Sequence, residues 1–316
     1  TKGTCTHEPL NMDWAKRYLG QRGLATKYLT EEIDPKVDPL APENKLIMAT
    51  GPLTGTCAST AGRYSVITKG ALTGAIACSN SGGFFGNEMK NAGLDMIIFE
   101  GKAKSPVYLF IDNDDCRLLD ASDYWGTSVW DTEEGIKERH GDPQIRVASI
   151  GVSGEKGVKF ACVVNDMHRA AGRSGVGTVM GSKNLKAVAL RGTKGVSVDD
   201  MPAFLKAVTD GKKVLAENAV TGQGLPAYGT QVLMNVINET GALPTRNHRD
   251  IQFEGASKIS AEAMAEPRES DGKPNLVRNA ACFGCTIACG RVSTIDRTHY
   301  TVADRPQYQI ASGGLE

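Results

Sequence analysis

Between residues 46 and 191, short apolar segments alternate with polar turns that contain glycine. A segment such as PVYLFID at 106–112 is rich in β-branched and aromatic residues, which suit the pleated surface of a sheet. One helix is expected in this region, at 128–139, because the sequence His-Gly-Asp that follows it supplies a helix end. The pattern predicts strands at 46–50, 63–68, 95–100, 107–112, 145–150, 158–163 and 186–191.

Helical patterns replace this alternation after residue 197. Asp199 and Asp200 are suitable N-caps for the segment 201–218, which carries a partial apolar stripe. The segment 225–244 predicts a second helix that ends at Gly241, with a proline shortly beyond. Strands followed by helices indicate an α+β fold.

The polar stretch RGTKGVSVDD at 191–200 separates these two patterns. A chain of 316 residues can form one large domain or two medium ones, and either can bury a full core. We therefore expect a β-rich domain at 1–197, followed by the first part of a mainly helical domain at 198–316.

Composition and charge exclude several classes of protein. The chain has 36 Lys+Arg against 36 Asp+Glu, and this balance argues against a nucleic-acid partner. No stretch approaches the roughly 20 uninterrupted apolar residues that span a bilayer, so no membrane span is expected. Glycine accounts for 36 of 316 residues, above the usual share of about 7%, which indicates tight turns or close backbone approach to a ligand.

The eight cysteines are unevenly spread. Three fall within eight residues, at Cys282, Cys285 and Cys289. A disulfide framework is typical of small secreted domains, so this cluster indicates metal chemistry in a reducing cytoplasm. The other five are expected to be small buried hydrophobic residues: Cys5, Cys57, Cys78, Cys116 and Cys162.

The C-x2-C-x3-C spacing of the cluster favours an iron–sulfur site, because short spacers let several thiolates converge on one cubane. The order is the reverse of the radical-SAM pattern, and three ligands are present where four are normally required. A structural zinc site usually pairs two Cys or Cys/His elements, and no second element is visible. Zinc and unligated thiols remain the alternatives.

A second candidate is NDMHRAAGRSGVGTVMGSKNLKA, residues 165–187. Gly172, Gly175, Gly177 and Gly181 permit a backbone that approaches an anion closely. Arginines flank the turn, and a guanidinium group suits phosphate oxygens. The strand and the spacing of a dinucleotide-binding loop are not in place. The alternative is a set of glycines at a sheet bend, with arginines facing solvent.

A third candidate is the pair of segments TAGRYSV and CSNSGGFFGNE. Each places a polar side chain, Arg63 in one and Asn80 in the other, beside glycine at the end of an expected strand. On chemistry alone this signal is weak, and exposed turns are the favoured interpretation.

Together these segments resemble one family. GPLTGT, GRYSVITKGALTG, NSGGFFGNEMKNAGLDMIIFEGKA, VNDMHRAAGRSGVGTVMGSKNLKAVALRG and CFGCTIACGR are similar to the amino-terminal half of the tungsten-dependent aldehyde oxidoreductases, the aldehyde:ferredoxin oxidoreductase family. The resemblance implies an amino-terminal all-β domain of two stacked sheets, which forms the base for a bis-pterin tungsten cofactor. Mainly helical domains then close over that base.

The resemblance also implies roles for particular residues. Arg63 would lie between the pterin and an iron–sulfur cluster. Asn80, by its backbone carbonyl, would help hold the Mg²⁺ that links the two pterin phosphates, and Gly82 would line the same site. The H-R-A-A-G-R segment would supply further phosphate contacts and the other Mg²⁺-binding carbonyl, through Arg169, Ala170, Gly172 and Arg173.

Cys282, Cys285 and Cys289 match three ligands of a [4Fe–4S] cluster in that family. The fourth ligand, two pterin-gripping motifs and the catalytic residues are expected beyond residue 316, so no catalytic residue is assigned in this chain. GGLE at 313–316 resembles the start of a segment that leads to a glutamate near the metal. A polypeptide ending there is expected to be poorly soluble and incompletely loaded.

The implied activity is oxidation of an aldehyde to a carboxylic acid, with electrons passing through the cluster to ferredoxin or an iron–sulfur subunit. An oligomeric enzyme of an anaerobic cytoplasm is expected, and molybdenum is the alternative metal. Within the family, a reductase of aromatic thioesters of the benzoyl-CoA type is the alternative. Outside it, the alternatives are a non-enzymatic iron–sulfur electron-transfer module and a zinc-stabilised structural protein.

Overall fold

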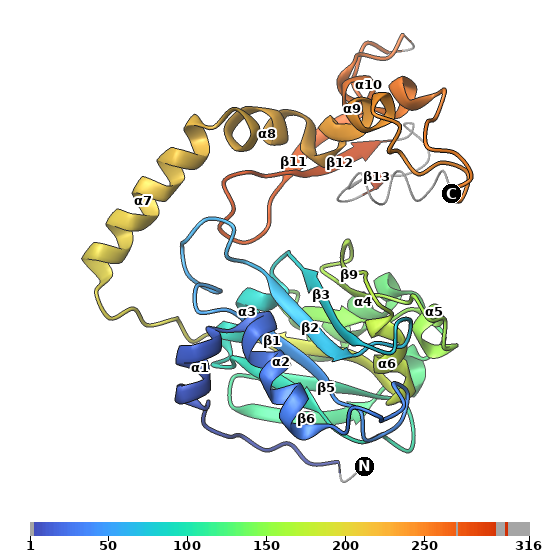
Figure 1. Ribbon diagram of the computed structural model, residues 1–316. Helices are drawn as coiled ribbons and strands as arrows, with labels where there is room; N and C mark the ends of the chain where they lie inside the picture. The colour runs from blue at the N-terminus through green and yellow to red at the C-terminus, as the bar shows by residue number, and fades with distance from the viewer. Residues whose placement is uncertain (1–2, 270, 295–300, 303–316) are drawn as a thin grey trace. The chain divides into compact units, whose positions relative to one another are not determined.

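The computed structural model describes residues 3–269, 271–294 and 301–302. The chain divides into two compact units, Thr1–Asp199 and Asp200–Glu316. The first contains two sheets and the second is mainly helical with one small sheet, so the fold class is α+β as expected (Figure 1).

The first unit is built on two sheets. In the four-stranded sheet, all neighbouring strands are antiparallel, in the order β3-β2-β1-β4. In the six-stranded sheet the order is β6-β5-β10-β7-β8-β9, and only the β10–β5 pair is parallel. The strands are β1 (Leu46–Thr50), β2 (Tyr64–Lys69), β3 (Ile76–Ser81), β4 (Met96–Phe99), β5 (Val107–Asp112), β6 (Asp115–Asp120), β7 (Arg146–Ser149), β8 (Val163–Asn165), β9 (Arg169–Ala171) and β10 (Leu185–Arg191).

Helices also belong to this unit, so it is not all-β as the family resemblance implied. Helix α4 follows the expected signals: Ser128 caps its first turn by accepting from the Asp131 amide, and Gly141 ends it in the left-handed region at φ 66°. The helices are α1 (Met12–Tyr18), α2 (Gln21–Glu32), α3 (Phe85–Asn91), α4 (Val129–His140), α5 (Val152–Glu155) and α6 (Val176–Ser182).

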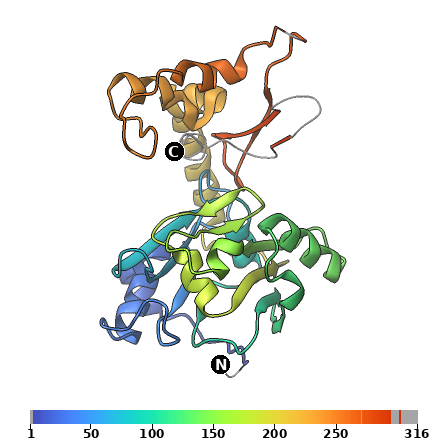
Figure 2. The ribbon, with the colours of Figure 1, turned by 90° about the vertical axis from the view of Figure 1, so that its right-hand side faces the viewer.

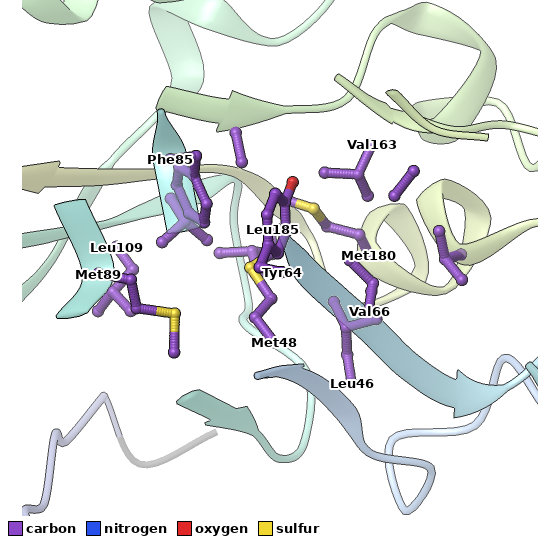
Figure 3. Close-up of a cluster of buried hydrophobic side chains, with 14 of the residues drawn as sticks. Leu46, Met48, Tyr64, Val66, Phe85, Met89, Leu109, Val163, Met180 and Leu185 are labelled. Atoms are coloured by element: carbon purple, nitrogen blue, oxygen red, sulfur yellow. The ribbon is translucent and has the colours of Figure 1, made fainter. Parts of the chain in front are cut away.

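The main core lies between the two sheets. Leu46 and Met48 of β1 face it, and so do Leu109 and Ile111 of β5, because alternate side chains of a strand point to the same face. Figure 3 shows side chains from both sheets meeting there with Phe85, Met89 and Met180 of helices α3 and α6.

The outer face of each sheet is also covered. Ile47 and Ala49 of β1 pack with Ala25 and Leu29 of α2, and on the other sheet Tyr108 of β5 lies in a cluster with Ile136 of α4. Both faces of these strands are therefore buried, which explains why their sequences are nearly continuous apolar runs rather than alternating ones.

Six of the seven expected strands are present, with bounds that differ by at most one residue at either end. The expected strand at 158–163 is wrong. Gly157 adopts φ 76°, and the Ala161 amide donates to the carbonyl of Val158, so this segment turns and β8 begins only at Val163. Strands β3, β6 and β9 were not expected, because polar or small residues interrupt their apolar patterns.

The second unit contains four α-helices and a three-stranded sheet in the order β11-β12-β13 among its described residues. The single helix expected at 225–244 is broken at Gly229, which adopts φ 65°. A Cβ atom there would lie 2.8 Å from the carbonyl oxygen of Cys289. The elements are α7 (Met201–Glu217), α8 (Leu225–Tyr228), α9 (Met234–Glu239), α10 (Ala261–Ala265), β11 (Leu276–Ala280), β12 (Gly290–Thr294) and β13 (Thr301–Val302).

Within the described parts of the chain, no helix has the length and apolar character needed to cross a bilayer.

A buried lysine predicts a pH dependence of stability. Lys183 is 4% exposed and donates to the carbonyls of Pro42, Asn44 and Gly101. Burial lowers the pKa of Lys183 to about 8, against about 10.4 in an unfolded chain. At pH values between these two pKa values, the unfolded state binds more protons than the folded state. The free energy of unfolding therefore rises with pH, by up to about 1.4 kcal/mol per pH unit.

Denaturant titrations at pH 7.5 and 9.5 measure this rise, with Lys183→Met as the control. The wild type should gain stability relative to the variant between the two pH values. Parallel pH profiles for the two proteins would show that the lysine does not titrate in this window.

Candidate functional site

Arg63 and Asn80 meet at one end of the four-stranded sheet. Arg63 directly precedes β2, and its Nη1 donates to Asn80 Oδ1 at 2.7 Å. Asn80 lies opposite Ser65 in the β2–β3 register, and its Nδ2 donates to Ser65 Oγ at 3.1 Å. The Arg63 carbonyl accepts from Thr54 Oγ1 at 3.1 Å, which fixes the backbone. Both site side chains are exposed, so they can reach a ligand.

Gly82 lies in the turn between β3 and α3, where the chain touches the β8–β9 hairpin. Its buried carbonyl accepts from Asn165 Nδ2 at 2.9 Å. At the next residue, Gly83, φ is 92° and a Cβ atom would lie 2.2 Å from Asp166 Oδ2. Only glycine fits there, because another residue would be strained and would also collide with the hairpin.

Arg169 of β9 is the most unusual residue of the site. Arg169 is only 3% exposed, yet its Nε and Nη2 have no hydrogen-bond partner among the described residues. A buried cation without a partner costs several kcal/mol, so such groups are normally paired. Two orphaned donors on one guanidinium fit an anion with several oxygens, such as a phosphate.

Ala170, Gly172 and Arg173 are exposed beside it. The Arg173 amide donates to Ser79 Oγ of β3 at 3.0 Å, which ties this segment to the four-stranded sheet. Strands β3 and β9 lie side by side in Figure 1, and Figure 2 shows the same light-green hairpin from another side. The seven residues predicted in the first unit therefore gather where the ends of β2 and β3 meet β9.

Three of the four glycines predicted to approach an anion have another role. A Cβ atom at Gly175 would lie 1.9 Å from the Lys159 carbonyl oxygen, and one at Gly177 would lie 2.3 Å from that of Cys162. At Gly181 it would lie 2.2 Å from the Gly154 carbonyl oxygen. These glycines let α6 pack directly on α5 and neighbouring backbone. Of the four, only Gly172 has open space, because a Cβ atom there would lie 4.0 Å from the nearest atom, Ala170 Cβ.

The cysteine cluster forms the loop between β11 and β12 of the second unit. All three thiols are half-buried, and the Cys285 amide donates to the Cys282 carbonyl at 3.1 Å. Gly284 and Ala288 adopt positive φ values of 62° and 48°, which bend the loop tightly. Within the residues that the structure describes, no three His, Cys, Asp or Glu side chains form a preassembled metal site.

Arg291 holds the end of this loop. It is fully buried, and its Nη1 donates to the carbonyls of Ala288 and Gly290 at 3.0 and 2.8 Å. Its Nη2 donates to the carbonyls of Leu225 and Pro226 at 2.9 and 2.7 Å. The loop is thus fastened to α8, and burial lowers the pKa of Arg291.

Four of the five isolated cysteines are half-buried, whereas Cys57 is exposed, so the expectation that these cysteines are buried is wrong for Cys57. Cys5 and Cys116 nevertheless pack against the main core, and Cys78 packs against the cluster under α2. Burial raises the pKa of Cys78 and Cys162, which keeps these thiols protonated and unreactive at neutral pH.

Replacing Cys57, Cys78 or Cys162 with serine should leave any bound metal in place. Burial raises the pKa of Cys78 and Cys162, which disfavours the thiolate form that binds a metal, and Cys78 packs against the cluster under α2. Among the described residues, none of the three thiols lies in a group of three metal-binding side chains. Elemental analysis of each purified variant measures this. Stoichiometric loss of metal from a single variant would place the metal site at that cysteine.

The sequence patterns did not identify the buried residues that connect the segments of the site. Tyr64, Asn165 and Asp166 are buried and link the strand ends to the hairpin. Asp166 and the next residue, Met167, adopt φ 49° and 60°. The signal available was the pair Asn-Asp shortly before the H-R-A-A-G-R segment, because these residue types favour tight turns.

The seven residues at these strand ends form a cradle in which Arg169 has two donors without a partner among the described residues, and three thiols share a separate loop of the second unit. The sequence profile described as "Aldehyde ferredoxin oxidoreductase, N-terminal domain" matches residues 1–192, and the one described as "domains 2 & 3" of the same enzyme matches residues 206–314. The chain belongs to the aldehyde ferredoxin oxidoreductase family, which confirms the resemblance.

Individual relatives agree with this assignment. The tungsten-containing aldehyde ferredoxin oxidoreductase of Pyrococcus abyssi is 52% identical over 309 residues, which cover 98% of this chain and 49% of the relative. An aliphatic sulfonate oxidoreductase, WOR-like subunit, of Pyrococcus furiosus is 32% identical over 322 residues, covering 95% of this chain and 49% of that protein. The chain spans about half the length of the curated relatives it matches.

A solved structure has the same fold. The active-site complex of benzoyl coenzyme A reductase with 1,5-dienoyl-CoA superimposes with a TM-score of 0.79 at 31% sequence identity, covering 95% of this chain and 46% of that chain.

Proposed function

We propose that this chain is part of an enzyme that oxidises aldehydes to carboxylic acids at a bis-pterin tungsten centre. The observation that carries the proposal is the orphaned Arg169 guanidinium, which lies where the ends of β2 and β3 meet β9. Relatives that are 48–52% identical carry the name tungsten-containing aldehyde ferredoxin oxidoreductase, and this supports the substrate class, the metal and ferredoxin as the electron acceptor. An iron–sulfur subunit is the alternative acceptor.

The first unit would be the domain that binds the cofactor. Arg169 would donate to phosphate oxygens of the pterins, and the exposed Arg173 would add a second cation. The carbonyls of Asn80 and Ala170 would hold a Mg²⁺ between the phosphates, and Gly82 and Gly172 would line the same site. Arg63, held by Asn80, would reach from the cradle toward an iron–sulfur cluster. The bound tungsten would supply the two-electron chemistry.

The second unit would carry the cluster. Cys282, Cys285 and Cys289 are proposed as three ligands of a [4Fe–4S] cluster, because one bent loop presents all three thiols. The buried Arg291 would orient Cys289 by holding the backbone of its two neighbours. No catalytic side chain is assigned within residues 1–316. A cytoplasmic location and an oligomeric state stay predictions.

Metal analysis combined with an assay tests the function. The protein is purified without oxygen from cells supplied with tungstate, and its tungsten, iron, zinc and pterin contents are measured. Tungsten and iron, with aldehyde-dependent reduction of ferredoxin, are the expected result. Iron alone would indicate an electron-transfer module, and zinc alone would indicate a structural protein.

A pair of arginine variants tests the role proposed for Arg63. Arg63→Ala should lower turnover with ferredoxin or the tungsten content, while Arg117→Ala should change neither. Arg117 is an exposed arginine of β6 that pairs with Asp115, away from the strand ends that form the cradle. Unchanged turnover and metal content in Arg63→Ala would contradict the role proposed for Arg63.

Reduction of an aromatic thioester is the second candidate. The structural similarity to the benzoyl coenzyme A reductase complex favours it, although that protein is only 31% identical to this chain. Oxidation of a reduced electron donor by benzoyl-CoA, with no activity on any aldehyde, would select this function over the first.

A further inference from the structure

The amide side chain of Asn165 connects the segments that form the candidate site. Asn165 is fully buried and all four of its hydrogen-bonding positions are used. Its Oδ1 accepts from Tyr64 Oη at 3.1 Å and from Ser81 Oγ at 2.6 Å. Its Nδ2 donates to the Gly82 carbonyl at 2.9 Å and to Asp166 Oδ2 at 2.7 Å. An asparagine with no spare donor or acceptor has a fixed orientation.

The partners of Asn165 belong to the segments that form the site. Tyr64 follows Arg63 at the start of β2, and Ser81 stands between Asn80 and Gly82. Asn165 itself pairs with Arg169 in the register of the β8–β9 hairpin. One side chain therefore connects the three segments that supply the predicted cofactor contacts.

Asp166 extends this connection to the following turn. Its Oδ2 also accepts from the amides of Phe84 and Phe85 at 2.7 and 3.3 Å, and its Oδ1 lies 3.6 Å from Nη1 of Arg146. These contacts hold the turn that contains Gly83 against the hairpin, so closely that a Cβ atom at Gly83 would lie 2.2 Å from Asp166 Oδ2.

We propose that Asn165 is a positioning residue, which holds the Arg63, Gly82 and Arg169 segments in the arrangement that the anionic cofactor requires. This inference rests on the proposed function. A site binds tightly when its groups are already in place, because the ligand then does not have to order them. Asn165 is fully buried, so it acts on the cofactor site through its hydrogen bonds to Gly82 and three other neighbours and through its strand pairing with Arg169.

A matched pair of variants separates positioning from general stability. Asn44 is also a fully buried asparagine, and its Nδ2 donates to Pro39 O, Thr68 Oγ1 and Lys69 O at 2.7, 3.0 and 3.1 Å. It holds the opposite end of β2 from Arg63. Asn165→Leu and Asn44→Leu should both lower the melting temperature, since each leaves buried groups without partners.

Only Asn165→Leu should lose cofactor. We expect about tenfold less tungsten and pterin per chain than in the wild type, which corresponds to about 1.4 kcal/mol, and near wild-type content in Asn44→Leu. Both contents are measured on purified protein and need no activity assay. Equal losses in the two variants, or full content in Asn165→Leu, would overturn the proposal.

A second, less disruptive pair of variants tests the proposal if Asn165→Leu does not fold. Ser81→Ala removes one bond to Asn165, whereas Ser182→Ala removes a hydroxyl that bonds only within α6. A smaller loss of tungsten and pterin in Ser81→Ala alone supports the positioning role, and identical contents in both variants contradict it. Wild-type protein without tungsten would refute the proposed function itself, whereas fully loaded wild type and variants would refute only the role of Asn165.

Discussion

Arg169→Met is expected to stabilise the cofactor-free protein and at the same time to abolish cofactor retention. The guanidinium is buried with two donors unpaired among the described residues, so removing it relieves a desolvation cost of about 1–3 kcal/mol. Methionine keeps the aliphatic stem that packs near Gly83. Two charge-assisted bonds to the cofactor would be lost, at about 1.5–3 kcal/mol each, which lowers affinity about a hundredfold or more.

Denaturant titration of protein from cells grown without tungstate measures the first effect, and tungsten content after growth with tungstate measures the second. Arg191→Met is the control, because Arg191 is paired with Glu88 and Asp142. That variant should lose stability and keep its tungsten. Destabilisation of the cofactor-free Arg169→Met protein, or undiminished tungsten in it, would contradict the assignment of Arg169 as an anion-binding group.

Lys186→Met should cost about 3–5 kcal/mol of the free energy of unfolding. Lys186 is fully buried in β10, and its Nζ lies 2.5 Å from Oε1 of Glu155, whose side chain is 1% exposed. Nζ also donates to the Thr127 carbonyl at 3.0 Å, and Glu155 Oε2 accepts from the Gly126 amide at 2.9 Å. Removing the lysine alone leaves a carboxylate buried without its cation.

The double variant Lys186→Met, Glu155→Leu should recover most of this loss. Replacing both partners of a buried ion pair by apolar groups is often close to neutral, because the desolvation cost of both charges disappears with their attraction. Urea titration of the wild type, the single variant and the double variant measures the difference. A double variant as unstable as Lys186→Met would show that the bonds to residues 126 and 127, and not the charge pair, maintain the fold here.

The sequence patterns located the site but could not rank its residues. Arg169 and Arg173 flank the same glycine and look equivalent in the H-R-A-A-G-R segment. Their burial differs because Arg169 begins β9, where alternate side chains point inward, whereas Arg173 lies beyond the end of that strand. The strand is only three residues long and contains two alanines, so no apolar alternation reveals it.

The glycines show a second limit of sequence reasoning. A glycine that admits a ligand and one that admits another backbone segment have the same local sequence signal. Gly172 is open, whereas Gly177 and Gly181 contact carbonyls of residues far earlier in the chain. That contact depends on how α6 packs against α5, which is a tertiary property. The buried support from Asn165 was missed for a related reason, because its four partners come from segments up to 101 residues away.

The position of β10 in the six-stranded sheet has a consequence for how the protein is made. The β8–β9 hairpin that carries Arg169 joins this sheet through β7, which pairs with β10, and β10 in turn pairs with β5 in a register that places Leu185 opposite Val107. This parallel pairing closes a long stretch of chain, and such non-local contacts form slowly. Because β10 lies between β5 and β7, the six-stranded sheet that carries the hairpin is complete only after residue 191 has left the ribosome. A cofactor bound at the proposed site would therefore meet the finished sheet only after nearly the entire first unit has been translated.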